Sequence, residues 1–96
     1  MADNNQPKIL IRYCAGCRWL LRASWMAQEL LSTFETQLSE VALAPGDSGE
    51  FRIFLDGATI WDRTVDKGFP EIKILKRRVR DIIAPEQSLG HCDIPI

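Results

Sequence analysis

The 96-residue chain lacks the features of several large classes of protein. It has no apolar run near the roughly 18 residues that a membrane span needs, and segment 1–7 has no basic stretch followed by an apolar one. The formal charge of −1 gives no strong attraction to nucleic acid or to acidic membranes. Three cysteines, an odd number, argue against the disulfide framework of a small secreted protein. We therefore expect a cytoplasmic protein that binds neither nucleic acid nor membranes.

The composition is that of one folded domain. Hydrophobic residues make up 46% of the chain and charged residues 26%, which separates it from disordered sequences. A chain of this length can build a single modest core. We assign the domain to residues 8–84 and expect segments 1–7 and 85–96 to be flexible, because residues 86–96 show no hydrophobic periodicity.

The most informative motif is a pair of cysteines, Cys14 and Cys17, placed between a predicted strand and a predicted helix. Residues 8–13 contain branched and long apolar side chains with no breaker, which is typical of a central strand, and a helical pattern follows over 17–38. Two thiols at this spacing can meet as a disulfide across one turn, and the positive end of a helix dipole favours a thiolate. The motif therefore predicts a dithiol redox site. Residues at helical spacing form the predicted buried stripe of this helix: Leu20, Ser24, Ala27, Leu31, Phe34 and Leu38.

Three shorter strands are expected in the middle of the chain. Weak alternation predicts a strand over 39–44, and a loop over 45–49 follows it. The Asp56-Gly57 dipeptide readily takes the positive φ angles of a two-residue hairpin turn, which would join strands 50–55 and 58–63. This turn would leave Phe54 and Trp61 on the sheet face away from Ile53. It also sets three predicted cross-strand pairs: Leu55 with Ala58, Ile53 with Ile60, and Arg52 with Trp61.

A second helix completes the predicted fold. Pro70 suits its first position, where a missing N–H costs little, and Ala84-Pro85 ends the pattern. Its predicted buried stripe consists of Ile72, Leu75, Val79, Ile82 and Ile83. The element order is therefore βαβββα, and a right-handed crossover makes the first two strands parallel neighbours. We expect an α/β (α+β) fold, a thioredoxin-like two-layer sandwich, with a four-stranded mixed sheet in the order 2-1-3-4 and two helices on one face.

Three motifs together resemble those of the selenoprotein W, T and H group, the Rdx family. They are Tyr13-Cys14-Ala15-Gly16-Cys17, Gly49-Glu50-Phe51 and Gly68-Phe69-Pro70. The chain is similar to a cysteine form of the family, since Cys17 stands where several animal members carry selenocysteine. The resemblance covers roughly 8–84, most of the chain, and implies thiol–disulfide oxidoreductase activity in cell redox homeostasis. It also implies redox proteins or glutathione as partners, with glutathione a co-substrate and no bound cofactor.

The sequence leaves open which of the two sulfurs attacks. Thioredoxins use the first cysteine, which is Cys14 here, whereas selenocysteine-containing relatives carry the more reactive atom at the position of Cys17. A place at the start of the predicted helix favours Cys14, because unpaired N–H groups stabilise a thiolate. Arg12 and Arg18 would also favour a thiolate if their side chains turned toward it.

A noncatalytic, redox-sensitive adaptor is the main alternative to an enzyme. Trp19 follows the dithiol closely, and Phe54 and Trp61 share the sheet face that two helices on one side would leave uncovered. These three aromatic residues are therefore the predicted docking residues, and the same face would suit a homodimer.

The C-terminal segment offers a further alternative. Cys14, Cys17, His91 and Cys92 have the ligand types of a zinc site, although His91 and Cys92 are adjacent in an unpatterned segment. Cys92 alone is interpreted as a bystander thiol, with a third redox thiol as the alternative. The basic run Lys76-Arg77-Arg78 with Arg80 is interpreted as a solvated helix face rather than a nucleic-acid site.

Overall fold

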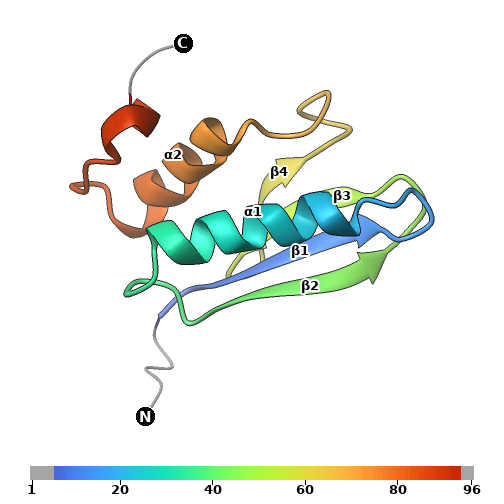
Figure 1. The fold of residues 1–96 in the computed structure, drawn as a ribbon, viewed down its shortest axis with the longest axis horizontal. Coiled ribbons are helices and arrows are strands. Elements are labelled where there is room, and N and C mark those ends of the chain that lie inside the picture. The colour runs from blue at the N-terminus through green and yellow to red at the C-terminus, as the bar shows by residue number, and fades with distance from the viewer. Residues whose placement is uncertain (1–5, 94–96) are drawn as a thin grey trace.

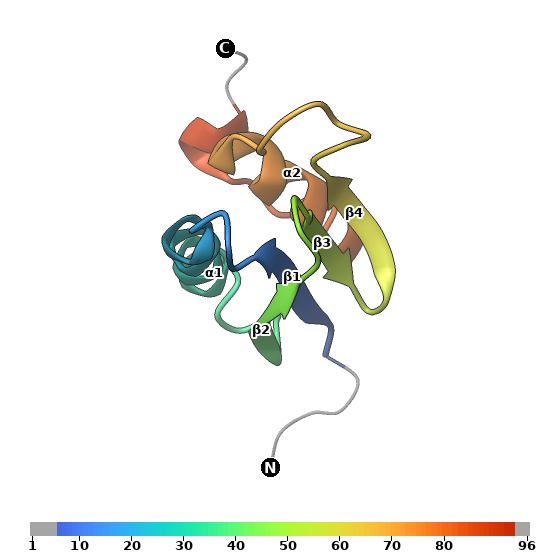
Figure 2. The same cartoon turned by 90° about the vertical axis from the view of Figure 1, so that its right-hand side faces the viewer.

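The chain forms a four-stranded sheet with two helices on one face (Figures 1 and 2). A computed structural model describes residues 6–93. The sheet order is β2-β1-β3-β4, with β1 parallel to β2 and antiparallel to β3, which confirms the predicted order and two-layer fold. The elements are β1 (Lys8–Cys14), α1 (Leu20–Thr33), β2 (Glu40–Gly46), β3 (Phe51–Leu55), β4 (Ala58–Asp62), α2 (Ile72–Ile83) and the short 3₁₀ helix η1 (Gly90–Asp93).

The core lies between the sheet and the helices. Alternate residues of β1 and β3 point into it, as the period of a strand requires: Ile9, Ile11, Phe51, Ile53 and Leu55. The second helix contributes Leu75 and Val79, as predicted, but Ile82 is exposed and was wrongly placed in the stripe. The buried residues of α1 are Ala23, Met26, Ala27 and Leu30.

The predicted stripe of the first helix was wrong by about one position. Leu20 and Leu31 are 46% and 40% exposed, whereas Ala27, Phe34 and Leu38 are buried as predicted. The reason is the position of α1 in its layer, because α2 flanks it on one side only (Figure 2). Trp25 and Met26 share a lining with the start of α2, and helical spacing therefore places Leu20 and Leu31 on the opposite side of α1.

The hairpin turn is confirmed, but the register beyond it is not. Asp56 and Gly57 have φ values of 50° and 86°, and Leu55 pairs with Ala58. A β-bulge then shifts the pairing, so that Ile53 lies opposite Trp61 rather than Ile60, and Arg52 lies opposite Asp62 rather than Trp61. The extra residue turns both Ile60 and Trp61 toward the core, and Trp61 is only 7% exposed. Its predicted place on the uncovered sheet face is therefore wrong.

The last residues of the described chain pack against α2. The Arg80 guanidinium donates to the Gln87 carbonyl at 2.8 Å and to the Asp93 carboxylate at 3.0 Å, and Leu89 packs against the core. The predicted flexible segments 1–7 and 85–96 include residues 1–5 and 94–96, which lie outside the described residues.

Within 6–93, no helix has the length and apolar character needed to cross a bilayer.

Candidate redox site

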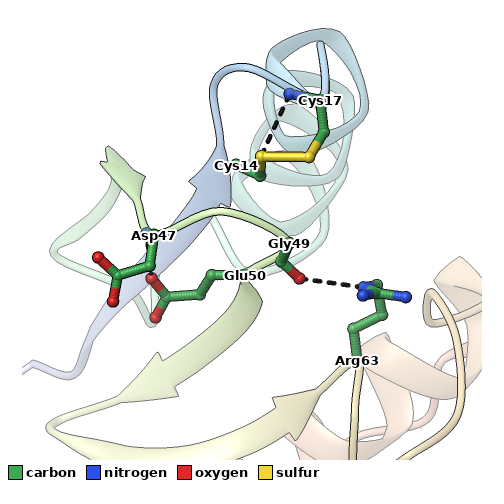
Figure 3. The surroundings of a disulfide bond; sticks show 6 residues. All are labelled: Cys14, Cys17, Asp47, Gly49, Glu50 and Arg63. Carbon is green, nitrogen blue, oxygen red and sulfur yellow. Dashed lines mark hydrogen bonds between the residues drawn. A yellow bond between two sulfur atoms is a disulfide. The ribbon is translucent and has the colours of Figure 1, made fainter.

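The two predicted site cysteines lie at the end of the central strand β1. Cys14 is the last residue of that strand and Cys17 lies in the turn that follows, and the structure joins them by a disulfide (Figure 3). Their Cα atoms are 5.3 Å apart, within the usual range for a disulfide. The spacing of the motif therefore does what the sequence predicts, because one turn brings the two sulfurs together.

The turn separates the cysteines from the helix. Arg18 has a φ of 62°, a left-handed conformation that ends the turn, and its N–H donates to the Ala15 carbonyl at 3.0 Å. The helix α1 begins only at Leu20, so the prediction of a helical pattern from residue 17 was wrong. Neither cysteine lies in the first helical turn, and the helix-start argument that favoured Cys14 as the attacker no longer applies.

The two cysteines differ in exposure. Cys14 is 3% exposed, whereas Cys17 is half-buried. The backbone N–H of Cys17 points at the Cys14 sulfur, with 3.2 Å between nitrogen and sulfur. A hydrogen bond of this kind stabilises a negative charge on the acceptor. The site thus has one half-buried cysteine and one buried cysteine whose sulfur accepts a backbone hydrogen bond.

A buried carboxylate holds the loop beside the dithiol. Burial alone would raise the pKa of Glu50, but the Asp47 N–H and the guanidinium groups of Arg12 and Arg52 outweigh that effect and lower its pKa from 4.5 to about 2. The Asp47 N–H lies 2.8 Å from one carboxylate oxygen, and the Arg12 Nε lies 3.2 Å from the other. Because Arg12 is held by Glu50, its side chain does not turn toward a thiolate as the sequence had allowed.

Gly46 explains how this carboxylate fits. It pairs with Cys14 across β1 and β2, and a Cβ at this position would overlap the Glu50 carboxylate. The Glu50 side chain therefore occupies the space that a larger residue beside Cys14 would fill. The sequence analysis did not predict this network. Its available signal in the sequence was Gly46, four positions before Glu50.

An aromatic cluster adjoins the dithiol on the other side. Trp19 meets Phe69 edge-to-face at 4.9 Å between ring centroids, and Phe51 lies 5.1 Å from Phe69. The guanidinium of Arg63 lies 5.0 Å from the Trp19 ring centroid and donates to the Gly49 carbonyl at 3.2 Å (Figure 3). Trp19, a predicted docking residue, is half-buried against the core.

These contacts bring the three sequence motifs together. Phe51 belongs to the Gly49-Glu50-Phe51 motif and Phe69 to Gly68-Phe69-Pro70, and both meet Trp19, two residues after the dithiol. Residues far apart in the chain therefore build one site at the end of β1.

The other two predicted docking residues lie elsewhere. Phe54 is half-buried on the uncovered sheet face, with the Arg52 guanidinium 5.4 Å from its ring centroid. Trp61 instead donates its indole N–H to the Gly68 carbonyl at 2.9 Å, and the Arg78 guanidinium lies 4.4 Å from its ring. Trp61 therefore acts as a core residue and offers little surface for docking.

The zinc ligands proposed from the sequence do not converge. His91 and Cys92 belong to η1, at the opposite end of the helical layer from the Cys14–Cys17 turn (Figure 1). Among residues 6–93, no group of three or more histidine, cysteine or acidic side chains is placed to hold a metal ion. Cys92 is a free, half-buried thiol at that far end.

The basic run of α2 is largely used within the fold. Lys76 pairs with Glu29 at 2.8 Å, and Arg78 pairs with Asp66 at 3.2 Å. Arg80 pairs with Asp81 and with Asp93, each at 2.7 Å.

Comparison with known proteins agrees with this arrangement. A crystal structure of a protein from Bordetella parapertussis is 65% identical, with a TM-score of 0.79, and the match covers 80% of this chain and 98% of that one. A selenoprotein W-related protein from Vibrio cholerae is 51% identical, with a TM-score of 0.80, over 82% of this chain and 99% of that one. No similar protein was found among curated protein sequences. The model of the Rdx family matches residues 8–81, and the chain therefore belongs to the Rdx family.

Proposed function

We propose that this protein is a cytoplasmic thiol–disulfide oxidoreductase that uses the Cys14–Cys17 dithiol. The observation that carries this proposal is the pair itself, joined at the end of the central strand with one cysteine buried and the other half-buried. An odd number of cysteines and the family's redox character support a reducing compartment and a catalytic rather than a structural disulfide.

Accessibility supports Cys17 as the proposed attacking cysteine. A partner sulfur must approach along the line of the bond that breaks, and the half-buried Cys17 permits this approach better than the buried Cys14. In the reverse direction, an incoming thiolate attacks the Cys17 sulfur and Cys14 leaves as a thiolate, which the Cys17 N–H stabilises. Cys17 is also the position that carries selenium in the selenocysteine-containing relatives.

The reaction then has two balanced exchange steps. The Cys17 thiolate attacks a partner disulfide, forms a mixed disulfide and releases the partner's second sulfur as a thiolate. The Cys14 thiolate next attacks the Cys17 sulfur, forms the internal disulfide and releases the partner's first sulfur. The partner gains two electrons, the dithiol loses two, and water supplies the protons. Two glutathione molecules or a thioredoxin-type protein would restore the dithiol.

Trapping of mixed disulfides tests these roles. We would start from the Cys92→Ser variant, which removes the remaining thiol, and add Cys14→Ser or Cys17→Ser. With glutathione disulfide as the probe, intact-mass measurement should show an adduct on Cys17 forming at least about tenfold faster than one on Cys14, because a buried thiol reacts slowly. Faster capture by Cys14 would reverse the roles.

Turnover separates an enzyme from an adaptor. The protein is mixed with a reporter disulfide in a buffer of glutathione and glutathione disulfide. If it is an enzyme, each protein molecule should reduce many molecules of the reporter. Reversible oxidation without turnover would instead favour the redox-sensitive adaptor.

A further inference from the structure

A groove lies between α1 and the start of α2, near the dithiol turn. It has a volume of about 560 Å³. Its apolar lining includes Met26, Phe69, Pro70 and Ile72. Trp25, on the same lining, is 48% exposed, although a large aromatic ring is normally covered in a folded protein. We call this feature the α1–α2 groove.

Two cations line the groove without a partner of their own. Arg22 and Lys73 form no ion pair within residues 6–93, whereas Lys76 and Arg80 of the same helical layer do. The Arg22 guanidinium lies 4.0 Å from the Phe69 ring centroid, so its charge sits directly above the apolar surface. Glu71 is the one acidic residue of the lining, which leaves a net positive charge.

The groove is continuous with the candidate redox site. Phe69 belongs to its lining and also meets Trp19 at 4.9 Å between centroids. Trp19 follows Cys17 by two residues. The Trp19–Phe69 contact therefore connects the segment that holds Cys17 to the groove lining.

We propose that the α1–α2 groove binds a segment of the redox partner protein that carries a large apolar side chain next to Asp or Glu residues. The apolar lining would bury the side chain, and Arg22 and Lys73 would pair with the acids. This assignment rests on the redox function proposed above, because the partner's cysteine must be joined to Cys17. Glutathione fits the groove less well, since it has carboxylates but no large apolar side chain.

Peptide disulfides test the groove directly. The probes are an acidic peptide, Cys-Gly-Phe-Asp-Asp, and a basic peptide, Cys-Gly-Phe-Lys-Lys, each made with one to three glycines between its cysteine and its phenylalanine. Each peptide is joined through its cysteine, as a disulfide, to the coloured thiol thionitrobenzoate. In the Cys14→Ser, Cys92→Ser background, release of that thiol measures capture of the peptide by Cys17. We expect the acidic peptide to react roughly tenfold faster at low salt, as two screened ion pairs would give, and a Ser-for-Phe acidic peptide to lose part of that advantage.

Charge reversal in the groove identifies the cations. Lys73→Glu and Arg22→Glu should each reduce the acidic-to-basic rate ratio severalfold, whereas Lys67→Glu, the same change at an exposed residue outside the groove lining, should leave the ratio near its starting value. The ratio is measured within one variant, so partial loss of folding or of thiol reactivity cancels. Equal rates for the two peptides, or a ratio that Lys67→Glu lowers as much as Lys73→Glu does, would overturn the groove assignment.

Failure of the redox function would look different. If Cys17 reacts with no peptide, the proposed activity fails, and titration with S-methylated peptides, followed by tryptophan fluorescence, then judges the groove alone. Tighter binding of the acidic peptide would support the groove, and equal or absent binding would refute it. If glutathione displaced the acidic peptide, or if the protein self-associated and Trp25→Ser abolished that association, the groove would have another occupant. Either result would overturn the assignment.

Discussion

Glu50 provides the sharpest test of how the fold supports the site. Its side chain is only 7% exposed, yet it carries a charge that three donors share: the Asp47 N–H, Arg12 and Arg52. We expect Glu50→Gln to destabilise the protein at neutral pH, because the amide cannot neutralise two guanidinium groups and directs an NH₂ group toward other donors.

The lowered pKa sets the magnitude of this effect. A fall from 4.5 to about 2 corresponds to about 3 kcal/mol of stabilisation from the charged form at pH 7. Because the pKa is lower in the folded state, this stabilisation is complete above the unfolded-state value near 4.5 and is lost as the pH falls toward 2. At pH 3 about 1 kcal/mol should remain.

Urea denaturation of the wild type and Glu50→Gln at pH 7, 4.5 and 3 measures this difference. Glu40→Gln is the matched control, because Glu40 is 53% exposed and pairs with Lys8 at 3.8 Å. We expect the control to change the free energy of unfolding by less than about 1 kcal/mol at every pH. A Glu50→Gln effect that is as small as the control, or that does not shrink between pH 4.5 and pH 3, would refute the assigned network.

Five further substitutions test the fold by urea denaturation. Leu30→Ala should lower the free energy of unfolding by about 2–5 kcal/mol and Leu31→Ala by less than about 1 kcal/mol, because only Leu30 is fully buried. Equal effects would contradict the assigned buried face of α1. Trp61→Phe should lower the free energy of unfolding by about 1 kcal/mol through its lost hydrogen bond, whereas Trp25→Phe should leave it almost unchanged. A larger effect of Trp25→Phe would contradict the buried position of Trp61. Gly57→Ala should cost about 1 kcal/mol, because only glycine takes its φ of 86° without strain, and an unchanged stability would argue against the assigned turn.

Local signals were sufficient for the order of elements and for the dithiol. The Asp56-Gly57 turn set the hairpin, and the cysteine spacing at a strand end placed both sulfurs in one turn. The meeting of Phe51 and Phe69 beside the dithiol had no local signal. The sequence analysis did not predict this contact, because residues so far apart in the chain are brought together by the sheet order rather than by any periodicity.

The errors in the buried face of α1 and in the register of the hairpin share a physical cause. In both places the local sequence permits two arrangements of similar stability, and tertiary contacts decide between them. A helix with apolar residues at both Leu30 and Leu31 allows two neighbouring stripes, and the single flanking helix selected the first. A strand can gain one residue in a bulge, and burial of Trp61 against Arg78 favours that extra residue at Ile60. Neither choice is visible in a window of ten residues.

The two sulfurs have different supports, and this difference agrees with the proposed order of events at the site. Cys14 is held in the sheet by its pairing with Gly46, and the Glu50 side chain fills the space beside that glycine. Cys17 belongs instead to a short turn, in which the Trp19 N–H reaches the Cys14 carbonyl at a long 3.4 Å. Reduction therefore frees a sulfur on a loop while the other stays fixed in the sheet. A fixed, buried sulfur is a poor attacker on an external disulfide but a well-placed resolver of one formed next to it, which is the basis of the proposed capture by Cys17 and closure from Cys14.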